Sequence, residues 1–162
     1  MERIDYKKVL PQLYSAYARL SQVTAEGPLP RRLQELVRIR ASQINGCAYC
    51  LDMHSRDARS LGEDERRLAV MAAWREAPFF TPRERAAFAW TEAITLLPEA
   101  GAPDAIYEEL TKHFSPEEIV ALTWLIVVIN GWNRLAVALR PPITGAVPAD
   151  EPTAAGTAPS AG

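Results

Sequence analysis

Residues 115–139 read SPEEIVALTWLIVVINGWNRLAVAL, and this stretch decides the fold class. Its first four residues combine a serine suited to a helix N-cap, a proline at the first helical position and a glutamate three residues after the cap. Together they form a capping box that predicts the start of a helix. The apolar run that follows is interrupted at Asn130, Gly131 and Asn133. Because of these interruptions, the run predicts the buried central helix of an all-α domain better than it predicts a membrane span.

The rest of the chain also predicts helices and no strands, since no stretch alternates apolar and polar residues over strand length. A second capping box at residues 81–84, TPRE, opens a helix that reaches about residue 97. Pro30 opens another helix, which Gly46 ends. Apolar spacing predicts further helices over residues 6–23, 47–61, 63–75 and 103–112.

Composition divides the chain into a helical domain over residues 1–140 and a tail over residues 141–162. The tail is rich in proline, alanine and glycine, so we expect it to be disordered. The chain carries 18 basic and 20 acidic residues, and the tail holds two acidic ones, which leaves the domain neutral. A neutral domain argues against nucleic-acid binding and gives weak support for self-association. No secretory signal or membrane segment is recognised, so we expect a cytoplasmic protein with no membrane partner.

The chemically dense segment is residues 35–54, ELVRIRASQINGCAYCLDMH. Cys47 and Cys50 follow a glycine at the predicted start of a helix, where free N–H groups lower a thiol pKa. The two lie on one helical face with a rise of about 4.5 Å between them, within disulfide range. His54 lies one turn beyond Cys50, so its imidazole can take the thiol proton. Glu35, on the preceding helix, can hold that ring in one tautomer.

These residues leave several functions open. Zinc binding is one of them, because Cys47, Cys50, His54 and Glu35 are all acceptable ligand types. A regular helix argues against it, since about 10.5 Å of rise separates Cys47 from His54. A redox-sensing protein without turnover and a general disulfide oxidoreductase would use the same pair of cysteines. The residues themselves predict a thiol–disulfide site and do not name its oxidant.

The segment resembles the core signature of the alkylhydroperoxidase D-like branch of the carboxymuconolactone decarboxylase family. The features that match are a glutamate, twelve residues to the first cysteine, C-x-x-C, and a histidine four residues further on. The likeness extends over roughly residues 1–142. It implies an all-helical fold that assembles as homotrimers or homohexamers, and cysteine-based peroxidase chemistry in antioxidant defence without haem, flavin or metal cofactor.

The resemblance also implies a role for each site residue. Cys50 would attack the hydroperoxide substrate and become a sulfenic acid, which Cys47 would resolve into a disulfide. His54 and Glu35 would relay the proton. The reductant would be a thiol, in the best-known member a lipoamide-bearing partner protein. This sequence departs from that member at Tyr49, where the prototype has a relay histidine. The phenol can donate a hydrogen bond but is no base at neutral pH, since its ordinary pKa is about 10.

Overall fold

The computed structural model describes residues 2–145 of the chain, and every regular element in that range is helical. This confirms the all-α prediction. The elements are α1 (Tyr6–Val9), α2 (Pro11–Ala25), α3 (Arg31–Asn45), α4 (Ala48–Ser60), α5 (Glu65–Val70), the 3-10 turn η1 (Met71–Ala73), α6 (Pro82–Thr95), α7 (Leu97–Ala100), α8 (Asp104–Thr111) and α9 (Pro116–Leu139). Both predicted capping boxes form, at Thr81 for α6 and at Ser115 for α9.

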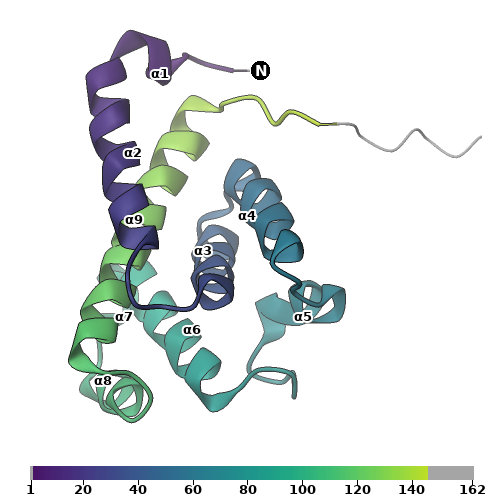
Figure 1. Ribbon diagram of the computed structural model, residues 1–162, viewed down its shortest axis with the longest axis vertical. Coiled ribbons are helices and arrows are strands. Elements are labelled where there is room, and N and C mark those ends of the chain that lie inside the picture. Colours follow the sequence, from purple (N-terminus) through teal and green to yellow (C-terminus); the bar gives the residue numbers. More distant parts are fainter. Residues whose placement is uncertain (1, 146–162) are drawn as a thin grey trace, which may run out of the picture.

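Helix α3 is the centre of the fold, with α9 on one side, α4 on the other and α6 across its end (Figure 1). Its apolar residues face two parts of the core. Leu33 and Val37 pack with residues of α6 and α9, while Leu36 and Ile39 pack toward α4 and η1. This shared core fixes α3, α4 and α9 against one another, and these three helices carry the candidate site.

Helix α9 runs without a break through the polar residues that interrupt its apolar pattern. It is long and apolar enough to cross a membrane by length and composition, but half of its most apolar window is buried inside the fold. Asn130 and Asn133 are buried in this helix and hydrogen-bond to side chains of α6 and α3 respectively. The apolar stretch is therefore the core helix that the sequence predicted.

The N-terminal helix differs from the prediction of one element over residues 6–23. Pro11 lacks an N–H and stands at the first position of α2, so the chain turns at Leu10 and α1 is a separate short helix. Helix α2 packs along α9 (Figure 1). The Tyr17 hydroxyl donates to the Val128 carbonyl at 2.9 Å, and the Trp132 indole N–H donates to Ser21 at 2.7 Å.

The segment at residues 63–75 also forms less helix than predicted, because α5 begins only after its cap, Asp64, and ends in η1. Glu63 lies outside the helix, buried, where its carboxylate pairs with Arg67 and Arg32. At the other end of the chain, α9 ends at Leu139, next to the predicted domain boundary. Residues 146–162 of the predicted tail lie outside the described residues, so the disorder of that tail stays a prediction.

Candidate active site

The connection between α3 and α4 consists of Gly46 and Cys47. Gly46 adopts the left-handed conformation with φ of 63°, and the N–H groups of Gly46 and Cys47 bond back to the Gln43 and Ser42 carbonyls. This is a Schellman motif, and it requires a residue that tolerates positive φ. Cys47 comes directly after it and is the N-cap of α4. The turn therefore delivers the first cysteine to the start of a helix, as the sequence predicted.

The two sulfur atoms lie together at that helix start. Cys47 Sγ accepts the backbone N–H of Cys50 at 3.3 Å, and the two Sγ atoms are 2.6 Å apart. Hydrogen bonds from the Cys50 side chain and from backbone N–H groups lower the pKa of Cys47 to about 7, although burial opposes the shift. The same side-chain hydrogen bond, together with burial, raises the pKa of Cys50. The pair therefore loses its first proton near neutral pH and keeps the second, shared between the two sulfurs.

Asn133 on α9 is a site residue that the sequence reasoning did not identify. It is fully buried, between Ile129 and Ala136, which pack against the cysteines from the same helix. Its amide donates to Ser42 Oγ at 3.0 Å, and a hydrogen bond from this side chain helps to lower the pKa of both thiols. In the sequence, an asparagine within the most apolar helix could have indicated this role. It was interpreted only as an interruption of the apolar pattern.

The histidine and the glutamate form a direct pair, as the sequence predicted. His54 Nδ1 lies 2.7 Å from Glu35 Oε2, and both side chains are largely buried. Arg38, one turn further along α3, pairs with the other carboxylate oxygen. Burial alone would raise the pKa of Glu35, but the hydrogen bond with His54 and the charge of Arg38 outweigh it and lower the pKa. Arg38 was missed in the sequence, although its i,i+3 spacing from Glu35 is typical of a helical ion pair.

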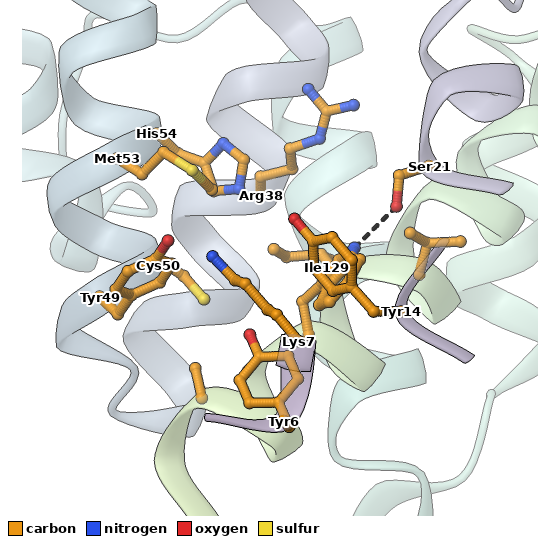
Figure 2. Close-up of a pocket in the computed structure, with 13 residues that line it drawn as sticks. Tyr6, Lys7, Tyr14, Ser21, Arg38, Tyr49, Cys50, Met53, His54 and Ile129 are labelled. Atoms are coloured by element: carbon orange, nitrogen blue, oxygen red, sulfur yellow. Dashed lines mark hydrogen bonds between the residues drawn. The ribbon is translucent and has the colours of Figure 1, made fainter. Parts of the chain in front are cut away.

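A cavity of about 210 Å³ is lined by Cys50 from the sulfur pair and by His54 and Arg38 from the ion-paired cluster. Figure 2 shows Cys50, Met53 and His54 projecting into it from α4, with Tyr6 and Lys7 opposite them. Most of the remaining lining is aromatic or aliphatic: Tyr14, Tyr49, Val128, Ile129, Trp132 and Ala136. Burial raises the pKa of Tyr6 to about 12, so its phenol stays protonated and is a hydrogen-bond donor. The cavity therefore presents one thiol and one imidazole to a largely apolar space, with Lys7 and Arg38 as the charged side chains in its described lining.

The two halves of the predicted site face the same cavity without touching. Among the described residues, no hydrogen bond joins His54 to Cys50, so a proton passing between them must travel through a molecule in the cavity. The four-ligand zinc arrangement is not assembled either. In the described part of the chain, the residues whose ligand atoms lie within 4.8 Å of one another are Glu35, His54 and the exposed Asp57, and the cysteines are outside that group.

Comparison with known proteins shows the family to which this chain belongs. A model of the Carboxymuconolactone decarboxylase family matches residues 11–93, which include all of residues 35–54. The chain belongs to this family. The protein YdfG of Bacillus subtilis is 38% identical over 138 residues, which cover 85% of this chain and 94% of YdfG.

Solved structures place the chain among the AhpD-like members of the carboxymuconolactone decarboxylase family. A protein of unknown function from Agrobacterium tumefaciens, for which an antioxidant-defence role as an AhpD protein has been suggested, is 42% identical. It superposes with a TM-score of 0.88 over 90% of this chain and all of that one. The debrominase Bmp8 shares the fold at 23% identity, with a TM-score of 0.75 over 83% of this chain and 72% of its own. The fold thus carries more than one chemistry.

Proposed function

We propose that this AhpD-like protein is a cysteine-based reductase of organic hydroperoxides. The observation that carries the proposal is the sulfur pair, in which the pKa of Cys47 is lowered to about 7 and Cys50 stands in the wall of a largely apolar cavity beside His54. A thiolate is the nucleophile that attacks a peroxide oxygen. A cavity of about 210 Å³ with aromatic walls favours an alkyl or aryl hydroperoxide over hydrogen peroxide, because it buries apolar surface of the substrate.

In the proposed oxidation, Cys50 in its thiolate form attacks the terminal oxygen of the hydroperoxide. Before this attack, the Cys50 thiol gives its proton to Cys47, across the 2.6 Å between the sulfurs, or through the cavity to His54. The O–O bond breaks, and the alkoxide takes that proton back from Cys47 or His54 and leaves as an alcohol, so Cys47 is again a thiolate. The Cys47 thiolate then attacks the sulfenic acid formed on Cys50 and expels hydroxide, which takes a proton from solvent to become water, and a Cys47–Cys50 disulfide remains. A thiol reductant restores both thiols.

Substitution of each sulfur separates these steps. Cys50→Ser abolishes hydroperoxide consumption, measured with cumene hydroperoxide and excess dithiothreitol. In the absence of any thiol reductant, Cys47→Ser consumes one equivalent in a burst and accumulates a sulfenic acid, detected by intact mass. The chain offers a matched control for the relay, since it has two histidines. His54→Gln slows oxidation by about a hundredfold. His113→Gln does not, because His113 pairs with Glu109 on α8, away from the cavity. Steady turnover by Cys50→Ser would refute the proposal.

The low pKa of Cys47 also favours a second candidate function, general disulfide exchange. A thiolate at a helix N-terminus is the reactive group of disulfide oxidoreductases. Turnover of insulin disulfides at a rate above that with hydroperoxide would favour this function. Reversible oxidation with no turnover by any reductant would instead indicate a redox sensor.

We further propose that the protein works in the cytoplasm as a homotrimer or homohexamer. Val120, Trp124 and Val127 recur at helical spacing on α9, and each is about half exposed in the single chain. Such a face is typical of an interface between subunits, because exposed apolar patches favour association. Light scattering on the full chain tests the assembly, and a monomeric mass at working concentration would contradict it.

A further inference from the structure

Lys7 is a cation at the aromatic cavity, and its amine has no anionic partner among the described residues. Figure 2 shows its side chain extending from α1 across the cavity, and Nζ lies over the Tyr14 ring at 5.4 Å from the centroid. The next residue of the same helix, Lys8, is instead paired with Asp5 at 3.0 Å. This hydrogen bond, the charge of Asp5 and the charge of Glu2 raise the pKa of Lys8. In the described part of the chain, Lys7 therefore keeps a positive charge that no side chain neutralises.

The carboxylates around this end of the molecule are already paired with other cations. Asp52 pairs with Arg56 at 2.8 Å. The described lining of the cavity contains no aspartate or glutamate, and its second cation, Arg38, is neutralised by Glu35. Lys7 is therefore the charge in this lining that remains available to an anionic ligand.

Lys7 stands between an apolar and a polar space. A second hollow of about 420 Å³ adjoins the cavity, and Tyr6, Lys7, Tyr49 and Met53 line both. The charged residues that line the second hollow are Glu2, Asp5, Lys7, Lys8, Asp52 and Arg56. Lys7 is also exposed to solvent. A ligand with an apolar body and one charged end fits this boundary, because its body is buried in the cavity while its charge stays on the polar side.

We propose that the preferred substrate is an apolar hydroperoxide that carries a carboxylate, and that Lys7 is the specificity-determining residue that binds this carboxylate. The inference rests on the proposed function for the hydroperoxide group, whereas the carboxylate site stands on the geometry of the cavity. A single lysine amine donates up to three hydrogen bonds and matches one negative charge. A phosphate ester, with close to two charges, would leave part of its charge unmatched at this site.

Lys7 acts on the substrate rather than on the thiols. The pKa of Cys50 is raised by its hydrogen bond with Cys47, by burial and by the charge of Cys47, and Lys7 takes no part in that shift. A carboxylate beside an apolar cavity is partly withdrawn from water, so its attraction to the amine is stronger than at an open surface. Loss of the Lys7 charge should therefore weaken binding of the carboxylate, which is seen in KM, without changing the ionisation of the sulfur pair.

The test uses two pairs of probes on the reduced full-length chain. The first pair, 4-isopropylbenzoate and 4-isopropylbenzamide, contains no peroxide, and its binding is measured by isothermal titration calorimetry. The second pair, cumene hydroperoxide and its para-carboxylate derivative, gives kcat and KM with dithiothreitol as the reductant. Lys7→Gln removes the charge and Lys7→Glu reverses it. Lys8→Gln is the matched control, because it removes the same charge one residue along α1, outside the cavity lining.

We expect the wild type to bind the benzoate about tenfold more tightly than the benzamide, because the amine forms a charge-assisted hydrogen bond with the carboxylate alone. This ratio should fall to about one in Lys7→Gln, invert in Lys7→Glu and persist in Lys8→Gln, and added salt should reduce it. The KM values of the two hydroperoxides should follow the same order. Equal binding of both probes by the wild type, binding of neither, a ratio that survives Lys7→Gln, or an equal loss in Lys8→Gln would overturn the inference.

The carboxylate site and the proposed function fail in different ways. If the preference for the benzoate depends on Lys7 but neither hydroperoxide is consumed, the proposed function fails and the carboxylate site stands. If both hydroperoxides are consumed with equal KM and the two inert probes bind equally, the carboxylate site fails and the proposed function stands.

Discussion

The sulfur of Cys47 caps the helix on which Cys50 lies, accepting the Cys50 backbone N–H at 3.3 Å. Serine, threonine, aspartate or asparagine usually supplies the capping atom. Here the cap is a group that also ionises, so the N–H that stabilises the helix stabilises the thiolate as well. The first turn of α4 therefore determines both where this helix begins and how reactive the Cys47–Cys50 pair is.

This arrangement predicts the pH dependence of Cys47 alkylation. Its thiolate forms as the pH rises through about 7, so the rate of modification by iodoacetamide should rise with a midpoint near that value. Cys50→Ala removes the largest cause of the lowered pKa and should move the midpoint upward, toward the ordinary thiol value. The urea-unfolded wild type gives that reference value in the same chain. Equal midpoints in wild type and Cys50→Ala would show that the neighbouring thiol has no such effect.

Glu35 gives a prediction for stability. Glu35→Gln leaves the Arg38 guanidinium in a buried site without its carboxylate, which should lower the free energy of unfolding by about 3 kcal/mol at neutral pH. Because the folded pKa of Glu35 is lowered, its contribution is complete above the ordinary value of 4.5 and disappears as the pH falls through the folded pKa. Urea titrations at several pH values should therefore show the two proteins converging in acid. A constant difference down to low pH would contradict the ion pair.

Much of this site follows from local sequence rules, because local geometry determines it. The glycine at 46 ends α3, and the spacing along α4 places Cys47 beside Cys50 and puts His54 one turn beyond Cys50. The contact between His54 and Glu35 joins two helices, and it was predicted because Glu35 is an acidic residue among apolar neighbours on the preceding helix and because the family signature pairs the two. The capping boxes at Thr81 and Ser115 act within a single turn, so the starts of α6 and α9 were also predicted from the sequence.

The remaining features depend on packing between distant segments, which periodicity does not specify. Asn133 contacts Ser42 across 91 positions of the chain, so nothing near it in the sequence indicates its partner. The wall of Tyr6 and Lys7 depends on the turn at Leu10, which brings α1 over the cavity. The place of Cys50 in the cavity wall depends on the position of α9 against α4, a tertiary contact that the C-x-x-C spacing leaves open.

Gly131 tests the contact between α2 and α9. A Cβ at this position would overlap the Tyr17 hydroxyl, which hydrogen-bonds to the Val128 carbonyl. Gly131→Ala should therefore destabilise the fold by about 2 kcal/mol through overpacking, against a gain of about 1 kcal/mol in helix propensity. In a Tyr17→Ala background the overlap is gone, and the alanine should then be stabilising. Thermal unfolding of the four proteins measures the coupling, and the same sign in both backgrounds would exclude the overlap as the cause.

Asn133 separates support of the thiolate from support of the fold. Asn133→Leu leaves the Ser42 hydroxyl and the Asn45 amide without this partner, which should cost about 2 kcal/mol of stability. It also removes a hydrogen bond that lowers the pKa of Cys47, so the alkylation midpoint should move to higher pH. Asn45→Ala is the matched control, because it breaks the same polar cluster at Asn130 and Asn133 and is not among the causes of the Cys47 shift. If Asn133 acts on the sulfur, both variants lose stability and only Asn133→Leu shifts the midpoint. A shift of equal size in Asn45→Ala would mean that loosened packing, rather than the Asn133 amide, changes the reactivity of the thiol.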